Sequence, residues 1–212
     1  MNVLKFVAYN HHIIKIARHY GWLPAARYTN LRDVRQFPRV GFLDIEWKAY
    51  DFQRHIAAVK ICRPLMTVAR DVEHRRQLAR VLDQAFELRE HCPHVVIVPK
   101  DLQLQHELEY VIPECFLLGY SVPTRYGGTK IPPTAFKRPV HLLGGRPDVQ
   151  RKLGDVLSVF SFDCNRFTLD AAYGDYFDGK IFRPHPNGGY ERCIRESLKN
   201  INALWRPYTR AT

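Results

Sequence analysis

Short apolar segments alternate with amphipathic stretches along nearly the whole chain, and this alternation most limits the folds that the sequence can adopt. Each apolar segment has the length of one buried strand, and the stretches between them carry apolar residues at helical spacing. Strands that alternate with helices favour a parallel sheet with crossover helices. The predicted strands are residues 3–9, 40–47, 65–70, 95–98, 115–120, 140–143 and 156–162. The predicted helices are residues 11–20, 50–60, 72–91, 102–111 and 190–204, and a further helix begins near Pro147.

Seven strands of this kind predict a trimmed (β/α)8 TIM-like barrel, with an eighth strand near residues 180–183. Barrels of this type usually have about 250 residues, whereas this chain has 212. A doubly wound open sheet is the alternative architecture. Because no repeat or linker divides the sequence, residues 1–212 are predicted to form a single barrel domain.

Three aspartates, Asp44, Asp71 and Asp163, directly follow predicted strands. Barrels and open α/β sheets both keep their chemistry at the carboxyl ends of the strands. We therefore expect the three carboxylates to converge on one site, and a convergent cluster of acids is typical of catalysis or metal binding.

Each of these aspartates has a chemical interpretation and an alternative. Asp163 ends an apolar run, where a partly shielded carboxylate can act as a nucleophile at an anomeric carbon; a turn or cap acid is the alternative. Asp44 is a candidate general acid or base, and Glu46, expected on the same strand face, is the fallback for that role. Asp71 opens a long predicted helix and would, in the alternative, be its N-cap.

The chain is strongly basic, with 32 Lys and Arg residues against 21 Asp and Glu residues, a formal net charge of +11 and a pI of about 9.6. Such an excess favours a polyanionic partner, most simply a nucleic acid, through contacts with phosphates. A basic surface without a specific partner is the alternative.

A long polar segment lies between Tyr120 and Arg138, and unusually long loops are often functional. Its basic residues are interleaved with Tyr126 and Phe136, a pattern that suits phosphate contacts combined with base stacking. The basic residues are Arg125, Lys130, Lys137 and Arg138. An ordinary solvated loop is the alternative.

Two glycines, Gly144 and Gly145, precede Arg146 at the start of a predicted helix, where a phosphate could be held. His185 and Cys193 fit no zinc-ligand spacing, so no metal site is predicted. The five cysteines form no C-x-x-C pair, which favours a reducing compartment. Because no apolar run reaches the length of a membrane span and the N-terminus has no signal-peptide core, we expect a soluble, cytoplasmic protein.

The order of a strand, Leu142-Leu143-Gly144-Gly145, a helix and a strand ending in Phe162-Asp163-Cys164 resembles the tRNA-guanine transglycosylases, which are (β/α) barrel enzymes. The short chain and Phe42-Leu43-Asp44 are more similar to the viral DNA-guanine transglycosylases. The resemblance implies that Asp163 is the nucleophile and Asp44 the general acid/base. It also implies the following substrate-binding residues: Asp71, which would read the base, with Gly119, Tyr120, Gly144 and Gly145.

The implied activity is the replacement of guanine in DNA by a 7-deazaguanine of the preQ0 or preQ1 type, through a covalent bond between Asp163 and the sugar. The target nucleotide would be flipped out or met in single-stranded form. The implied partners are nucleic acid, DNA more than RNA, and a free 7-deazaguanine base, without a redox cofactor or nucleoside triphosphate. In a virus, the location would be the host cytoplasm.

Three other functions remain open at this point. One is an enzyme like the tRNA-guanine transglycosylases, and another is a non-catalytic barrel that binds nucleic acid. The third is a nuclease in which Asp44, Glu46 and Asp71 hold Mg²⁺.

Overall fold

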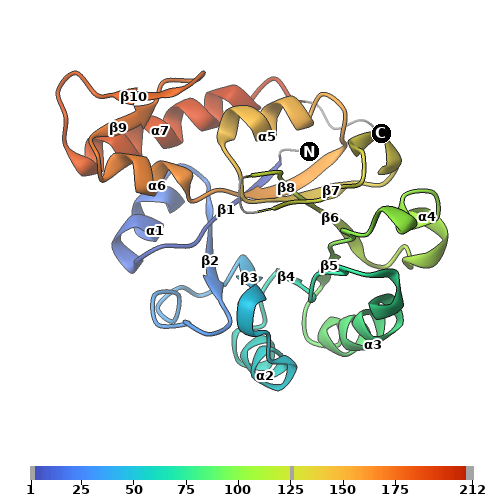
Figure 1. Ribbon diagram of the computed structural model, residues 1–212. Helices are drawn as coiled ribbons and strands as arrows, with labels where there is room; N and C mark the ends of the chain where they lie inside the picture. Colours follow the sequence, from blue (N-terminus) through green and yellow to red (C-terminus); the bar gives the residue numbers. More distant parts are fainter. Residues whose placement is uncertain (1–2, 125–126, 209–212) are drawn as a thin grey trace.

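The computed structural model describes residues 3–124 and 127–208. Eight parallel strands form a closed barrel in chain order, so the fold is the predicted (β/α)8 TIM-like barrel (Figure 1). Closure occurs where β1 pairs with β8 and Phe6 lies opposite Asp163. The strands are β1 (Leu4–Val7), β2 (Leu23–Arg27), β3 (Phe42–Asp44), β4 (Met66–Val68), β5 (His94–Ile97), β6 (Leu117–Ser121), β7 (Val140–Leu143) and β8 (Val159–Asp163).

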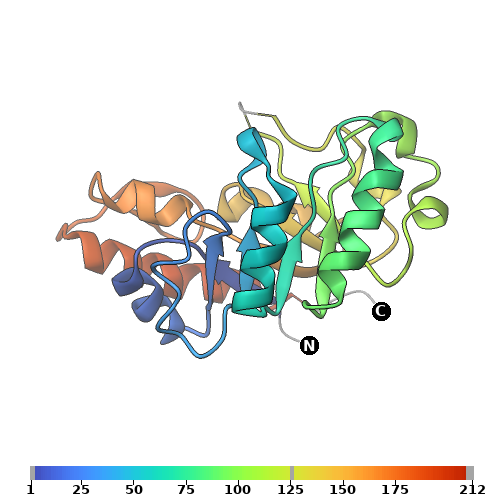
Figure 2. The same cartoon turned by 90° about the horizontal axis from the view of Figure 1, so that it is seen from below.

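Helices surround the strands, and the chain after β8 forms a group of elements at one side of the barrel (Figures 1 and 2). The α-helices are α1 (His11–Arg18), α2 (Phe52–Cys62), α3 (Leu78–Arg89), α4 (Leu108–Val111), α5 (Pro147–Leu153), α6 (Arg166–Ala171) and α7 (Tyr190–Trp205). The short 3-10 helices are η1 (Trp47–Ala49), η2 (Arg75–Gln77), η3 (Leu102–Leu104) and η4 (Pro133–Ala135). None of the helices within the described ranges is long and apolar enough to cross a membrane.

The position predicted for the eighth barrel strand was wrong. The segment near residues 180–183 contributes to β10 (Phe182–Pro184), which pairs in antiparallel fashion with β9 (Asp175–Phe177) outside the barrel. The missing barrel strand is β2, whose sequence LPAAR contains a proline and two alanines. These residues have low strand propensity, so the pattern of β-branched residues that reveals the other strands is absent here.

The barrel interior is filled by side chains from alternate positions of the strands. His141 of β7 lies between the rings of Phe6 and Phe42, with ring centroids 5.9 and 4.8 Å away. On the outside of the barrel, Phe162 packs against Trp22 and Trp205 and attaches β8 to the helical layer. Burying an aromatic side chain of this kind contributes about 1.5–3 kcal/mol to stability, so these contacts support the strand end that carries Asp163.

Candidate active site

The three aspartates lie at the carboxyl ends of their strands, on the face of the barrel where TIM-barrel chemistry takes place. Asp44 ends β3, Asp163 ends β8, and Asp71 follows β4. After burial, the charge of Asp163 and, to a smaller extent, that of Asp71 raise the pKa of Asp44. The three acids therefore lie at the same end of the barrel, with Asp44 in the electrostatic field of the other two.

Asp44 has the electrostatics of a proton-transfer group. Burial raises the pKa of its carboxyl group to about 7, and the charge of Asp163 adds to this effect. Two groups oppose the rise: the Ile45 backbone N–H, which donates to Asp44 Oδ1 over 2.8 Å, and the positive charge of Arg27. An acid with a pKa near the operating pH can both give and take a proton, which is the requirement for general acid–base catalysis.

Asp163 is held by the turn that follows β7. The Gly144 N–H donates to Asp163 Oδ1 over 2.9 Å, and Gly144 has a φ of 62°, in the left-handed region that favours glycine. The side chain of Gln150 donates from Nε2 to the carbonyl oxygens of Gly144 and Asp163, over 2.6 and 2.7 Å. Gln150 therefore ties the turn to the end of β8 and fixes the direction of the Gly144 N–H group.

His141 is a site residue that the sequence did not reveal. Its ring is fully buried, Nδ1 lies 2.8 Å from Ser161 Oγ, and Nε2 lies 3.6 Å from Asp163 Oδ1. In the sequence it sits inside an apolar run that predicts only a buried strand. The available signal was strand periodicity. His141 lies two residues before Leu143, the last residue of β7, so the two side chains point to the same face of the strand.

Asp71 pairs with a lysine from the next strand end. Lys100 Nζ lies 2.6 Å from Asp71 Oδ2 and 3.0 Å from Glu73 Oε1. Burial raises the pKa of Asp71, and Lys100 opposes that rise. Burial lowers the pKa of Lys100, but Asp71 and Glu73 together outweigh it, so the net pKa of Lys100 is raised.

The helix-cap alternative for Asp71 is wrong. The predicted helix over residues 72–91 begins only with η2 and α3, and the N-cap of α3 is Gln77. Val72 instead forms a parallel bridge with Pro99, so the backbone after β4 continues beside the backbone after β5. That extended course places Asp71 against Lys100.

Glu46, the fallback for proton transfer, lies beyond the end of β3. Its Oε2 accepts from Arg27 Nη1 over 2.9 Å. Two of the three acids considered for Mg²⁺, Glu46 and Asp71, are thus paired with cations. Within residues 3–124 and 127–208, no group of three or more His, Cys, Asp or Glu side chains is placed to hold a metal ion.

The other two residues weighed as metal ligands have separate contacts. His185 Nε2 lies 3.1 Å from Glu196 Oε2, and its Nδ1 accepts from the Asn187 backbone N–H over 3.1 Å. The thiol of Cys193 donates to the carbonyl oxygen of Gly174 over 3.4 Å. Both side chains therefore serve the packing of the elements that follow β8.

A cavity of about 500 Å³ opens beside Asp44, which is within the range of pockets that bind small molecules and cofactors. Amide side chains and arginines line it, together with the ends of β1 and β2. The lining residues are Ala8, Tyr9, Asn10, Ala25, Ala26, Arg27, Asn30, Arg32, Asp33, Asp44 and Asn165. The order of the wall depends partly on Asn165, whose Oδ1 accepts from the Ala8 N–H over 2.8 Å.

The residues predicted to line a base pocket from β6 are engaged in packing. A Cβ atom at Gly119 would lie 2.7 Å from methyl groups of both Val96 and Val98, so the barrel interior requires glycine there. The ring of Tyr120 packs edge-on against Phe136, with centroids 5.3 Å apart. Contacts of these residues with a base stay a prediction.

The predicted basic loop divides into exposed and engaged residues. Lys130 and Lys137 are exposed, whereas Arg138 pairs through Nε with Glu109 Oε2 over 2.7 Å and donates to the carbonyl oxygens of Ile112 and Pro113. A phosphate contact by Arg138 would require it to leave these partners. Phe136, one of the two predicted stacking residues, is buried, and Arg125 and Tyr126 lie outside the described residues.

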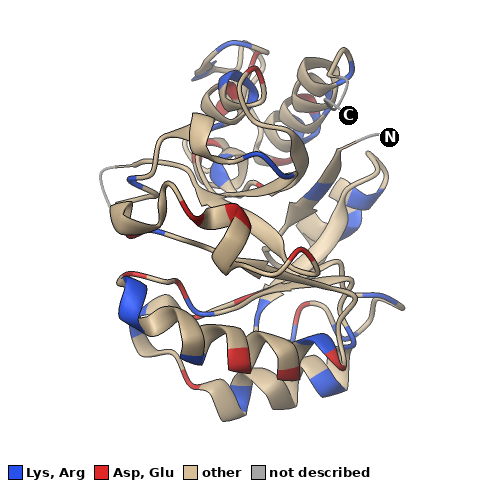
Figure 3. Ribbon diagram, turned by 90° about the vertical axis from the view of Figure 1, so that its right-hand side faces the viewer, with Lys and Arg blue, Asp and Glu red and all other residues tan. Residues whose placement is uncertain are grey.

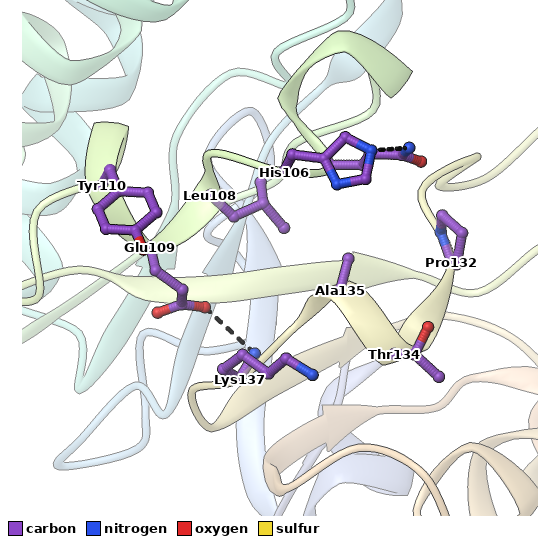
Figure 4. Close-up of a pocket in the computed structure, with 9 residues that line it drawn as sticks. His106, Leu108, Glu109, Tyr110, Pro132, Thr134, Ala135 and Lys137 are labelled. Carbon is purple, nitrogen blue, oxygen red and sulfur yellow. Dashed lines mark hydrogen bonds between the residues drawn. The ribbon is translucent and has the colours of Figure 1, made fainter.

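A second cavity, of about 440 Å³, lies where the loop that follows β5 meets the loop that follows β6 (Figure 4). Its wall includes Lys137, whose backbone N–H donates to Glu109 Oε1 over 3.1 Å, and Tyr110, whose side chain is 88% exposed. Tyr110 belongs to α4, outside the segment for which the sequence predicted basic and stacking residues. The lining residues are Gln105, His106, Leu108, Glu109, Tyr110, Pro132, Thr134, Ala135 and Lys137.

Acids accompany many of the remaining basic residues. Figure 3 shows Lys and Arg interleaved with Asp and Glu on the side of the molecule that it presents. Arg75 donates from Nε and Nη2 to the carboxylate of Glu107, over 2.7 and 3.0 Å. Arg146, which was predicted to hold a phosphate, is the N-cap residue of α5. Its Nε lies 3.0 Å from Oδ1 of Asp148 in the first turn of that helix.

The model of the family of unknown function DUF6610 matches residues 17–206 of this sequence. The chain belongs to this family. The matched range of this DUF6610 protein contains Asp44, Asp71, His141 and Asp163. A comparison with curated proteins finds no significant match.

Solved structures that resemble this DUF6610 protein include the YdjI aldolase from Escherichia coli K12, known from an X-ray crystal structure. The TM-score is 0.56 and the sequence identity 11%, and the match covers 98% of this chain and 92% of the aldolase chain. The likeness therefore extends over the whole barrel and concerns the fold.

Proposed function

We propose that this protein replaces guanine in a nucleic acid with a 7-deazaguanine base, with Asp163 as the nucleophile and Asp44 as the general acid/base. The observation that carries this proposal is the pairing of two different carboxyl groups at the barrel mouth. Asp44 has a pKa raised to about 7 and can hold a proton, while the carboxyl group of Asp163 accepts a hydrogen bond from the Gly144 N–H at the end of β8. A proton donor and a second carboxyl group that attacks the sugar are the two groups that a double displacement at an anomeric carbon requires.

The first half of the reaction forms a bond between a carboxylate oxygen of Asp163 and C1′ of the target nucleotide. The bond between C1′ and N9 of guanine breaks, and its electron pair leaves with the base, which receives the proton held by Asp44. In the second half, the Asp44 carboxylate takes a proton from the incoming 7-deazaguanine. The base then attacks C1′, and the Asp163 carboxylate is released.

A polynucleotide substrate is supported by the charge of the molecule. The net charge is +11, and Lys130 and Lys137 are exposed on the segment that follows β6. A base within a duplex cannot reach a pocket at the barrel mouth, so the target nucleotide would be flipped out or bound in single-stranded form. The cavity of about 500 Å³ beside Asp44 provides room for the base. We propose DNA as the substrate. Exchange in RNA instead of DNA would revise this choice.

Aldolase chemistry through a lysine imine has less support in this site. An amine must lose its proton before it attacks a carbonyl group. Lys100 follows β5 at the barrel mouth, but its ion pairs with Asp71 and Glu73 hold its pKa above the usual value. Lys100 is therefore better suited to hold Asp71 than to act as a nucleophile.

The test is incorporation of a labelled 7-deazaguanine into nucleic acid, measured by mass spectrometry of the released nucleosides. Single-stranded DNA, duplex DNA and tRNA are compared as substrates, each with and without EDTA. We expect label in DNA, unaffected by EDTA, no label with Asp163→Asn, and strongly reduced labelling with Asp44→Asn. The matched control is Asp155→Asn, because this exposed acid pairs with Arg151 of α5 on the outside of the barrel.

Each other result points to a different function. Label in tRNA alone would place the protein with RNA-modifying enzymes, and strand cleavage that EDTA abolishes would indicate a nuclease. Tight binding without any exchange would indicate a non-catalytic nucleic-acid-binding barrel. Full exchange by Asp163→Asn would overturn the assignment of the nucleophile.

A further inference from the structure

His141 is a polar group enclosed in an apolar part of the barrel. Its ring is fully buried between Phe6 and Phe42, and one ring nitrogen, Nδ1, lies 2.8 Å from Ser161 Oγ. The other nitrogen, Nε2, is buried and has no hydrogen-bond partner within the described ranges. It faces Asp163 Oδ1 at 3.6 Å, slightly beyond hydrogen-bond length. A buried polar atom left unpaired is costly, so the contact with Asp163 calls for a physical explanation.

The hydrogen bonds around the ring determine where its protons lie. Ser161 Oγ donates toward Met66 Sδ, 3.8 Å away, and a hydroxyl group has only one hydrogen to donate. Ser161 then accepts from His141 Nδ1–H, and a proton must lie between Nε2 and Asp163 Oδ1, because two lone pairs would otherwise face each other. If Ser161 instead donates to Nδ1, the neutral ring carries its hydrogen on Nε2. Both arrangements place a proton between Nε2 and Oδ1.

We infer that His141 is a positioning residue that holds Asp163 through an Nε2–H···Oδ1 contact and leaves Oδ2 as the oxygen that attacks the sugar. This inference rests on the proposed role of Asp163 as the nucleophile. The Gly144 N–H donates to the same oxygen over 2.9 Å, so the two donors converge on Oδ1. In the described part of the chain, every hydrogen bond and ion pair of this carboxyl group goes to Oδ1.

The side chains around His141 leave Asp163 as the charged group that its ring faces. The side chains that face the ring from β1, β3 and β4 are Phe6, Phe42 and Met66, and none of them carries a charge. The titratable group that faces the ring is Asp163, and Asp163 in turn adds to the raised pKa of Asp44, whose main cause is burial. A proton on Nε2 faces Asp163 Oδ1, so the contact acts on the orientation of that carboxyl group.

The kinetic test compares three variants in the base-exchange assay. We expect His141→Leu to lower kcat by about 10²-fold, the cost of a misplaced reacting group, while KM stays close to that of the wild type. His141→Gln, which keeps an N–H donor directed toward Asp163, should restore part of kcat. The matched control is His55→Leu, because His55 is equally buried but contacts Thr67 and Tyr50 outside the barrel interior. We expect the His55→Leu variant to be less stable than the wild type but to keep its kcat.

A second measurement requires neither activity nor a His141 variant. Two-bond ¹H–¹⁵N NMR spectra report which imidazole nitrogens carry protons, and Nε2 of His141 should be protonated between about pH 6 and pH 8. Asp163→Asn should move that resonance, because it removes the charge that Nε2 faces. A bare Nε2 in the wild type over this range, or wild-type kcat in His141→Leu, would overturn the inference. A protonated, Asp163-dependent Nε2 without any base exchange would support the contact and count against the proposed function instead.

Discussion

Asp71 Oδ2 lies 2.6 Å from Lys100 Nζ, and this ion pair joins the segment after β4 to the segment after β5. The backbone follows the same connection, since Lys100 N–H donates to the Val72 carbonyl oxygen over 3.0 Å. The two strand ends are thus fixed relative to each other beside the proposed reaction site. A change at either side chain should affect stability as well as activity.

Replacement of Lys100 by Met should lower the free energy of unfolding by about 1–3 kcal/mol, the cost of an unpaired buried acid. This loss of stability is smaller than that expected for a fully buried ion pair, because the side chains of Lys100 and Asp71 are 17% and 18% exposed. Chemical denaturation at neutral pH measures it. The double variant Asp71→Asn/Lys100→Met should regain part of the loss, and the exposed Lys130→Met is the control. Equal stability of Lys100→Met and wild type would show that the pair contributes nothing to the fold.

The stability of the protein should fall as the pH rises from about 4 to 7, because of Asp44. Its pKa is raised from 3.8 to about 7 in the folded state, so between these values the folded protein binds a proton that the unfolded chain has released. The stabilisation is complete below pH 3.8 and is lost as the pH passes 7. Denaturation curves across this range should show a loss of a few kcal/mol that Asp44→Asn removes. A variant with the same pH dependence as the wild type would contradict this prediction.

Asp44→Asn should reduce the rate of base exchange by about 10²–10⁴-fold, the usual contribution of a general acid–base group. Glu46→Gln serves as the comparison, because Glu46 is paired with Arg27 and should have a smaller effect. The measurement is kcat/KM as a function of pH, with a transition near 7 in the wild type that is absent from Asp44→Asn. The roles of the two acids would be exchanged if Glu46→Gln were the more damaging change.

Replacement of both Lys130 and Lys137 by Ala should weaken nucleic-acid binding for every sequence alike. If each lysine contacts one phosphate, the slope of log K against log salt should fall by about 0.9 per residue on duplex DNA and 0.7 on single strands. Fluorescence anisotropy over a range of salt concentrations measures the slope. Lys60→Ala/Lys152→Ala, a second pair of lysines on helices α2 and α5, is the control of equal charge. An unchanged slope in the first variant would place the binding surface elsewhere.

Most of the architecture was predictable from the pattern of apolar residues. Strand β7 and the start of helix α5 lie where the sequence places them, because β-branched and leucine-rich runs and a proline at the first helical position are strong local signals. Strand β2 was missed because Pro24 and two alanines give no such signal. Pairing with β1 and β3 on both sides makes this segment a strand, and that information is not local.

The sequence could predict the acids of the site that end strands. It could not predict the side chains that contact these acids from neighbouring strands. Asp44 and Asp163 could be found because each ends an apolar run. The contact of His141 with Asp163 and that of Lys100 with Asp71 depend on the register of neighbouring strands, β7 with β8 and β4 with β5, which no local pattern encodes. Similarly, the charge of Arg138 was visible in the sequence, but its engagement by Glu109 was not.

Barrel closure has a consequence for the order in which the protein becomes active. The pairing of strands β1 and β8 links the two ends of the barrel sequence, and it carries the entropic cost of closing the longest loop between paired strands. The Cys164 N–H, next to the proposed nucleophile, donates to the Phe6 carbonyl oxygen across this joint. During synthesis, Asp44 leaves the ribosome long before Asp163, so the two carboxyl groups meet only when the eighth strand is in place. The proposed reaction needs both carboxyl groups and would therefore require the completed barrel.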